Sequence, residues 1–386
     1  MVKFSKVAQS VVPSLTRRLF NMARQYDDVI DFTLGDPDMP PHQAIKDAAC
    51  KAIQEGSIRY SQNAGLLALR EMICKYYQRT EGLQYDPISE VIVTVGAMEG
   101  LYLTLLALLD PDDEVIIPAP YYVNYVQMVH LCGAKAVVVD NPEVTDLSFR
   151  VEDVERAITP KTKIIMINTP SNPSGRLIPQ GHIDQLAALA KKHDLIVIAD
   201  EVYKSLIYDK VEFRSIVTRE GMRERTILIN SLSKEFCMTG WRVGYVMAPA
   251  EIVATMTKLQ ENVVACAPVP SQYAALEALS GNGDYSANMV ETFTKRRDVL
   301  VEGIKAIPQL SCLSPEATFY LMVDISKTNM TSEEFAVALL QAEHVAVVPG
   351  IAYGVSCDKY IRIAFTLSEE KIREGVQRIE RFMQIL

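Results

Sequence analysis

The stretch Leu195-Ile-Val-Ile-Ala-Asp-Glu-Val-Tyr203 decides the fold. Its first five residues are all apolar and lack the polar alternation of a strand that has one face in water. An uninterrupted apolar run of this length is typical of a strand buried on both faces, as in a mostly parallel sheet that helices cover. The run ends at the carboxylate of Asp200, and ligands gather at the carboxyl ends of such strands.

Further runs of the same kind lie on either side of this stretch, and helical stretches separate several of them. We expect strands at Val91–Val95, Glu114–Pro118, Lys135–Val139, Lys163–Asn168, Leu195–Asp200, Thr226–Asn230 and Val243–Met247. The helical stretches include Gly100–Leu109, Gly181–His193 and Pro249–Glu261. This alternation predicts an α/β fold with a mostly parallel seven-stranded sheet, in a large domain that we place at residues 45–284.

After about residue 285 the predicted strands and helices follow one another in a different order. A long charged helix at about Ser286–Ala306 precedes the apolar run Phe319–Asp324, then a helix, then the runs Val345–Gly350 and Tyr360–Phe365. Strands and helices mixed in this way favour a smaller α+β domain, which we place at residues 285–386. Residues 1–44 are left as an N-terminal segment.

The composition narrows the classes of function. With 39 basic and 48 acidic residues the formal charge is −9, so nucleic acid is not an expected partner. The seven cysteines form no Cys-x-x-Cys pair and the five histidines show no metal spacing, which predicts no metal site and a cytoplasmic location. The most apolar stretch, Val91–Leu109, is interrupted by Gly96, Glu99 and Gly100, so we expect no membrane span.

Polar residues and glycines follow several of the predicted strands. Gly96-Ala-Met-Glu-Gly100 follows the first strand, Asn168-Thr-Pro-Ser-Asn-Pro-Ser-Gly175 the fourth, Asp200-Glu-Val-Tyr203 the fifth and Ser231-Leu-Ser-Lys234 the sixth. Parallel strands end at the same edge of a sheet. A glycine turn, an amide, a carboxylate, a phenol, hydroxyls and an amine would therefore meet at one rim, where we expect the ligand site.

Each of these residues also has a plainer interpretation. Gly96-Ala97-Met98 could bind a phosphate at a helix N-terminus or form an ordinary turn. Asp200 either meets a buried cationic partner or caps the next helix. Lys234 is either a surface charge or a reactive amine near the guanidinium of Arg242, which could bind a phosphate. Arg362, inside an apolar run, is either part of a structural ion pair or a clamp for a substrate carboxylate.

Taken together, these motifs resemble the class I and II aminotransferases of the fold-type I family of pyridoxal-phosphate enzymes. The resemblance covers nearly the whole chain and rests on Asn168–Gly175, Asp200–Tyr203, Ser231-x-Ser-Lys-x7-Arg242-x-Gly244 and Tyr360-x-Arg362, in that order. It implies a pyridoxal 5′-phosphate-dependent enzyme that moves an amino group from an L-amino acid to a 2-oxo acid by a ping-pong mechanism. The acceptor expected from the family is 2-oxoglutarate.

The resemblance also implies a role for each residue of the rim. Lys234 would hold the cofactor as a Schiff base and then carry a proton between the substrate Cα and the cofactor. Asp200 would keep the ring nitrogen protonated, while Asn172 and Tyr203 would hydrogen-bond the ring hydroxyl. Lys234, Asp200 and Tyr203 are thus the expected catalytic residues. The remaining cofactor contacts are Ala97, Met98, Ser231 and Arg242 at the phosphate, and Tyr122 stacked on the ring.

Further implied roles belong to residues away from this rim. Gly35 and Arg362, together with Asn172, would bind the substrate and its α-carboxylate. Tyr60 would reach the phosphate across the interface of a homodimer. In the family fold, residues 1–44 join the C-terminal residues in one small domain, which closes over the substrate and excludes water.

The sequence leaves the amino donor open. Some aspartate-preferring relatives carry a lysine where Met98 stands, so an aromatic or other apolar donor is favoured over aspartate. Ala317 and Ser174 also depart from the usual family residues, glycine and threonine. A carbon–sulfur β-lyase is the alternative reaction on this fold, but Phe32–Met39 has the aminotransferase form. A non-catalytic binding or regulatory module is the alternative of another class, and the intact Lys234 argues against it.

Overall fold

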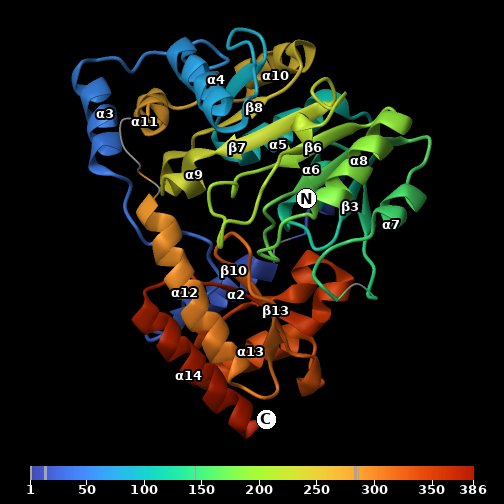
Figure 1. Ribbon diagram of the computed structural model, residues 1–386, viewed down its shortest axis with the longest axis vertical. Coiled ribbons are helices and arrows are strands. Elements are labelled where there is room, and N and C mark those ends of the chain that lie inside the picture. Colours follow the sequence, from blue (N-terminus) through green and yellow to red (C-terminus); the bar gives the residue numbers. More distant parts are fainter. Residues whose placement is uncertain (1, 13–14, 144, 282–284, 286) are drawn as a thin grey trace.

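The computed structural model describes residues 2–12, 15–143, 145–281, 285 and 287–386. It has an upper body built on a seven-stranded sheet and a lower body built on a four-stranded sheet (Figure 1). The chain ends at the foot of the lower body, beside its long last helix, α14 (Glu369–Ile385).

The seven-stranded sheet confirms the predicted fold class. From edge to edge its strands are β2 (Val91–Thr94), β8 (Gly244–Met247), β7 (Thr226–Ser231), β6 (Ile196–Asp200), β5 (Thr162–Asn168), β3 (Glu114–Pro118) and β4 (Lys135–Val139). Only β8 runs antiparallel to its neighbours; the other described pairs are parallel. Each predicted strand is therefore present, with ends that differ by one residue at most.

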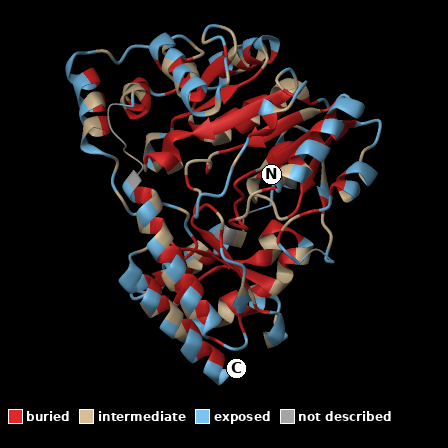
Figure 2. Cartoon of the chain, in the orientation of Figure 1, coloured by how far each residue is buried: buried red, intermediate tan, exposed pale blue. Residues whose placement is uncertain are grey.

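Alternate residues of a central strand face two different cores. Ile164 and Met166 of β5 pack in a core that α5 (Gly96–Leu108) and α10 (Ala250–Val263) cover. Ile165 and Ile167 pack in another core, which α8 (Gln180–Lys192) covers. Figure 2 shows the strands buried and the outer faces of α8 and α10 exposed. Burial on both faces explains why the strands read as continuous apolar runs.

The predicted helices of the upper body are present with small shifts. The stretch predicted at Gly100–Leu109 is α5, which begins four residues earlier, at Gly96. Gly96 has φ +73°, a left-handed conformation that glycine adopts without strain, so the chain turns directly from strand into helix. The other helices of this body are α3 (Gln43–Gln54), α4 (Leu67–Glu81), α6 (Asn124–Leu131), α7 (Val151–Arg156), α9 (Leu232–Glu235) and α11 (Val269–Leu279).

The lower body has the mixed strands and helices expected of an α+β unit. Its antiparallel sheet has the order β12 (Val348–Pro349), β13 (Tyr360–Ala364), β10 (Tyr320–Asp324) and β9 (Ser311–Cys312). The helices α12 (Ala287–Lys305), α13 (Ser332–Glu343) and α14 pack around it. Ser286, the predicted start of α12, and residue 284, the predicted domain boundary, lie outside the described residues.

The N-terminal residues pack with the lower body. After α1 (Lys6–Ser10) and α2 (Leu15–Ala23), strand β1 (Ile30–Asp31) pairs in parallel with β11 (Val345–Ala346). Ile30 and Phe32 are buried in the same core as β10 and β13. Helix α1 instead contacts α6 of the upper body, so this segment spans both bodies.

Short 3₁₀ helices complete the secondary structure. They lie at Ile216–Thr218, Thr239–Trp241, Ser326–Thr328, Gly350–Tyr353 and Val355–Lys359. Among the described residues, no helix combines the length and the apolar character that crossing a membrane requires.

Candidate active site

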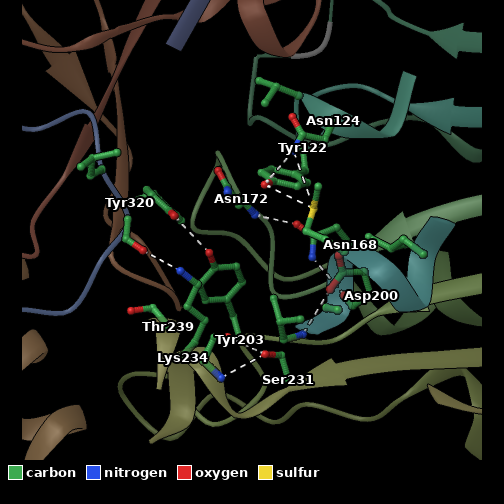
Figure 3. Close-up of a pocket in the computed structure, with 18 of the residues that line it drawn as sticks. Tyr122, Asn124, Asn168, Asn172, Asp200, Tyr203, Ser231, Lys234, Thr239 and Tyr320 are labelled. Atoms are coloured by element: carbon green, nitrogen blue, oxygen red, sulfur yellow. Dashed lines mark hydrogen bonds between the residues drawn. The ribbon is translucent and has the colours of Figure 1, made fainter. Parts of the chain in front are cut away.

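A cavity of about 400 Å³ lies where the carboxyl ends of β5, β6 and β7 meet the lower sheet. Its floor is set by strand register, because Asn168 of β5 is paired with Asp200 of β6, and Ser231 ends the adjacent β7. Tyr320 of β10 and Arg362 of β13 complete the lining from the lower body. Figure 3 shows Asn168, Asp200, Ser231 and Tyr320 around one space.

The cavity brings together almost all of the residues singled out in the sequence. It is lined by Gly35, Ala97, Met98, Tyr122, Asn172, Asp200, Tyr203, Ser231, Lys234, Arg242 and Arg362. Tyr60 is the exception: it does not line the cavity, and it is 88% exposed. The roles given to these residues stay predictions, but their common location is a property of the fold.

Lys234 extends into the cavity from the short helix α9, directly after β7. The hydroxyl of Ser231 caps that helix by accepting a hydrogen bond from the backbone N–H of Ser233 at 3.0 Å. The Lys234 amine donates to the carbonyl oxygen of Gly35 at 2.6 Å (Figure 3). Burial lowers the pKa of Lys234 to about 8, so loss of its proton near neutral pH is facilitated.

Asp200 is almost completely buried at the end of β6. One carboxylate oxygen accepts a hydrogen bond from the Tyr125 hydroxyl at 2.6 Å and the other accepts from the backbone N–H of Val202 at 3.3 Å. Burial nevertheless raises the pKa of Asp200 to about 6, and none of the described cations forms an ion pair with it. A buried carboxylate of this kind would be stabilised by a cationic ligand.

A chain of amide hydrogen bonds links the two bodies across the cavity. Asn168 donates from its side chain to the Asp200 carbonyl oxygen at 3.0 Å, and its own amide oxygen accepts from the Asn172 N–H at 2.8 Å. The Asn172 side-chain oxygen accepts from the Arg362 guanidinium at 2.9 Å. Arg362 and Asp200 are thereby held at fixed positions relative to each other.

Arg362 retains one free donor. Besides Asn172, its guanidinium donates to the Thr33 carbonyl oxygen at 2.6 Å and lies 4.4 Å from the Tyr320 ring centroid. Its Nε–H is buried and has no hydrogen-bond partner among the described residues. An unsatisfied buried donor is costly, and an anionic ligand would satisfy it.

The end of the cavity at α5 suits a phosphate. The first backbone N–H groups of α5 have no partners within the helix, and its dipole favours an anion there. The chain at Gly244 passes so close that an added Cβ would lie 2.7 Å from the backbone nitrogen of Ala97. At Gly96 an added Cβ would lie 2.5 Å from a guanidinium nitrogen of Arg242. Only glycines allow this close approach of donors.

Two hydrogen-bonded groups, each containing a tyrosine, form further parts of the wall. The hydroxyls of Tyr203 and Tyr320 share a hydrogen bond at 3.0 Å. Asn124 donates from its side chain to the Tyr122 hydroxyl at 3.2 Å, and the Met98 sulfur accepts from the same amide at 3.6 Å. Burial raises the pKa of Tyr122 to about 12, so it stays a neutral phenol.

Several lining residues were not assigned roles from the sequence. They are Arg17, Phe20, Tyr125, Asn124, Asn168, Ser233, Thr239 and Tyr320. Asn168 stands inside a quoted motif and Tyr320 inside the quoted apolar run Phe319–Asp324, so their position in these stretches was a usable signal. Arg17 and Phe20 come from α2, and no local pattern there indicated a site.

Comparisons with known proteins place the chain in one family. The model of the family described as aminotransferase class I and II matches residues 27–379. The chain is similar to the putative aminotransferase YugH of Bacillus subtilis, at 39% identity over 98% of both chains. It is similar to the aromatic-amino-acid aminotransferase 2 of Thermococcus litoralis, at 34% identity over 97% of both chains. A single mutant of the Thermus thermophilus aspartate aminotransferase superposes with a TM-score of 0.93 and 35% identity, over 99% of this chain and 100% of the other.

Proposed function

Because the chain belongs to the class I and II aminotransferase family, we propose that it binds pyridoxal 5′-phosphate at this cavity and works by a ping-pong mechanism. The chain is an aminotransferase; the cofactor, the roles of single residues and the substrates are the proposed part. One observation carries the proposal: an amine, a buried carboxylate and three guanidinium groups line a single cavity at the strand ends.

The donors of the cavity fit the cofactor. The N-terminus of α5 with Ala97 and Met98, the Ser231 hydroxyl and Arg242 would hold the phosphate. Tyr122 would lie against the ring, and Asn172 and Tyr203 would hydrogen-bond its hydroxyl. When bound, pyridoxal 5′-phosphate supplies an aldehyde for the amino group and a ring that withdraws electrons from the substrate Cα.

Asp200 would pair with the protonated ring nitrogen. Its pKa of about 6 reflects a carboxylate that is buried without a cation, and a cationic nitrogen would remove that penalty. The Tyr125 hydroxyl, 2.6 Å away, fixes the carboxylate so that it cannot turn toward solvent. Asp200 would thereby keep a positive charge at the ring nitrogen at neutral pH.

Lys234 would act both as the covalent anchor of the cofactor and as the base at the substrate Cα. Burial lowers the pKa of its amine to about 8, which places it near the pH range where a general base is most effective. Its hydrogen bond to the Gly35 carbonyl oxygen would be given up when the cofactor is attached. Tyr203, held by Tyr320 at 3.0 Å, would remain the hydrogen-bond donor beside it.

The substrate α-carboxylate would be bound by Arg362, with Asn172 and Gly35. The unsatisfied Nε–H of Arg362 supports this assignment, because a carboxylate would accept from it. Any side chain at Gly35 would collide with the Tyr320 phenol, so a glycine keeps this part of the cavity open. The loop that carries Gly35 belongs to the N-terminal segment, which packs with the lower body.

The domain limits 1–44, 45–284 and 285–386 are part of the proposal. The pairing of β1 with β11 supports the assignment of the N-terminal segment to the small domain. We propose that this small domain closes over the substrate and excludes water. The cytoplasmic location also stays a proposal, supported by seven free cysteines, which suit a reducing compartment.

We propose a homodimer in which Tyr60 reaches the partner's phosphate site. Tyr60 is 88% exposed in the single chain, and Ile53 and Ile58, which precede it in the sequence, are also more than half exposed, at 53% and 52%. Asn63, three residues further, donates to the Ala265 carbonyl oxygen, and the adjacent Val263 is 52% exposed. A cluster of exposed apolar side chains of this kind is typical of an interface.

A Tyr60→Phe variant tests the role of Tyr60. Loss of one hydrogen bond to a charged phosphate should weaken cofactor affinity about 10-fold, within the range for bonds to charged groups. Equilibrium dialysis of the cofactor measures this, and light scattering measures the dimer. Full affinity in the variant, or a monomer with full cofactor occupancy, would contradict the proposed role.

The amino donor is proposed to be an aromatic or other apolar amino acid, with aspartate as the alternative, and 2-oxoglutarate as the acceptor. Met98 lines the cavity with a neutral thioether, which supports the apolar donor. The compared relatives and structures include both aromatic and aspartate aminotransferases. They favour transamination over β-elimination and over a non-catalytic module.

A half-reaction screen tests the proposed function. The cofactor-loaded enzyme is mixed with single L-amino acids, and the absorption change from the pyridoxal to the pyridoxamine form is followed. We expect conversion with phenylalanine or tyrosine, and return of the spectrum when 2-oxoglutarate is added. Release of pyruvate and ammonia from a cysteine conjugate without a 2-oxo acid would instead favour the lyase.

A further inference from the structure

The charges that line the cavity leave one cation without a role. Among the described residues, the lining contains four cationic side chains, Arg17, Lys234, Arg242 and Arg362, and a single carboxylate, Asp200. In the proposed function, Lys234 carries the cofactor, Arg242 meets its phosphate and Arg362 meets the α-carboxylate. Asp200 is matched by the ring nitrogen. Arg17 therefore remains as a surplus positive charge at the cavity.

Helix α2 packs against the lower body through side chains other than Arg17, and this packing positions Arg17 at the cavity. Leu19 and Ala23, one helical turn apart, are buried in the core of the lower body. Arg18, which directly follows Arg17, forms an ion pair with Glu333 of α13. With these contacts fixing the helix, Arg17 and Phe20, which are also one turn apart, face the cavity and line it.

The Arg17 guanidinium is available for a ligand. Its central carbon lies 5.3 Å from the Phe20 ring centroid, and no hydrogen bond or ion pair to another described residue occupies it. Arg24 lies on the same ring at 5.4 Å but does not line the cavity. Stacking on a ring leaves the edge of a guanidinium free, so its N–H donors can still meet a planar anion.

We propose that Arg17 binds the distal carboxylate of a dicarboxylic substrate, and so determines how well the enzyme uses glutamate and 2-oxoglutarate. The inference rests on the proposed function, because it names the substrate class of that site. A guanidinium binds a carboxylate through two parallel hydrogen bonds, and the neighbouring Phe20 ring offers an apolar surface to the substrate methylenes. Met98, at the same cavity, has no charge that could replace it.

The position of Arg17 next to Phe20 also accommodates an apolar amino acid as the amino donor. Arg17 is exposed and extends from a long flexible side chain, so it can move aside when an aromatic substrate packs against Phe20. One position would then serve two kinds of substrate. An apolar donor would pack on the ring in one half-reaction, and a 2-oxo diacid would pair with the guanidinium in the other.

The test compares glutamate with phenylalanine in the half-reaction of the cofactor-loaded enzyme. In Arg17→Met the ratio of kcat/KM for glutamate to kcat/KM for phenylalanine should fall about 10- to 100-fold, the range for hydrogen bonds to a charged group. Arg17→Lys, which keeps a charge without the planar fork, should give an intermediate ratio. Arg24→Met is the matched control, because it removes a guanidinium from the same ring outside the cavity; its ratio should stay within twofold.

A binding measurement separates substrate recognition from turnover. Glutarate and 3-phenylpropanoate, which carry no amino group, are titrated into the loaded enzyme while the cofactor absorbance is followed. Arg17→Met should raise the Kd of glutarate at least about 10-fold and change that of 3-phenylpropanoate less than twofold.

Four outcomes would overturn the assignment of Arg17: an unchanged ratio in Arg17→Met, an equal loss with both substrates, the same loss in Arg24→Met, or a wild-type enzyme that converts phenylalanine but not glutamate. A wild-type enzyme that converts no amino acid at all would overturn the proposed function instead. Unchanged glutarate affinity in Arg17→Met would also exclude a role of Arg17 in binding.

Discussion

The rim of the seven-stranded sheet and helix α2 contribute to the cavity in opposite ways. At the rim, Asp200 is nearly fully buried and Lys234 is half-buried, and both have side-chain hydrogen bonds. On α2, Arg17 is exposed, lies on the Phe20 ring and has no hydrogen bond or ion pair to another described residue. In the proposed roles, the groups that take part in proton transfer lie at or next to strand ends, whereas the group that meets different substrates lies on an exposed segment. We infer that reaction type and substrate choice are set by different bodies of the molecule.

The largest effect should come from the rim. Lys234→Ala should lower kcat at least about 10³-fold, because it removes the residue proposed both to anchor the cofactor covalently and to move the Cα proton. Single-turnover absorbance with phenylalanine measures the loss, and Arg17→Met is the control from α2. Retention of the lysine-bound cofactor spectrum by Lys234→Ala would contradict the assignment, and so would comparable losses of phenylalanine conversion in the two variants.

A second difference concerns Asp200 and pH. In the protein without cofactor, its pKa of about 6 lies above the ordinary value of 3.8, so the folded state holds a proton that the unfolded state has lost. The stability that this proton gives is fully present below pH 3.8 and is lost as the pH rises to about 6. The loss amounts to roughly 3 kcal/mol of unfolding free energy.

Urea unfolding of the cofactor-free protein between pH 4 and 6.5 measures this loss. Asp200→Asn has no carboxyl to titrate, so its unfolding free energy should fall less over that range than that of the wild type. Arg17→Met, at an exposed position, should follow the wild type within about 0.5 kcal/mol at each pH. If the unfolding free energies of wild type and Asp200→Asn changed in parallel with pH, burial would not raise the pKa of the Asp200 carboxyl. In activity, Asp200→Asn should lower kcat about 10²- to 10³-fold.

The smallest effect should come from adding a positive charge to the cavity wall at α5, on the side of the seven-stranded sheet. Met98→Lys places an ammonium at the start of α5, and it should raise the ratio of kcat/KM for aspartate to that for phenylalanine about 10-fold. The half-reaction screen measures this ratio. Met98→Leu is the matched control, since it keeps the volume without a charge. An unchanged ratio in Met98→Lys would mean that substrate choice cannot be shifted from the rim and rests on α2.

The sequence predicted the sheet and its rim well because their signals are local. Strands buried on both faces are apolar almost throughout, and the last residue of each strand is fixed in place by the register of parallel pairing, as with Asn168 and Asp200. Eleven predicted site residues therefore line the same cavity. Tyr60 does not, and its proposed role depends on a second chain, which the structure of one chain cannot test.

Arg17, Phe20 and Tyr125 were not assigned roles because what positions them is distant in sequence. Helix α2 reaches the cavity only because Leu19 and Ala23 enter a core whose other members lie beyond residue 200 or at Ile30 and Phe32. Tyr125 acquires its partner 75 residues away, at Asp200. Periodicity can indicate that a helix has a buried face, but not which distant element covers it.

The reversed direction of β8 affects how Lys234 and Arg242 are brought together during folding. Ser231 at the end of β7 and Gly244 at the start of β8 are register partners, so the loop that carries Lys234 and Arg242 starts and returns at adjacent positions. Closing a connection this short costs little chain entropy compared with a crossover between parallel strands. The amine and one guanidinium therefore take up their relative positions as soon as a single hairpin forms. Asp200 and Arg362 reach their positions only when contacts between segments that are distant along the chain have formed.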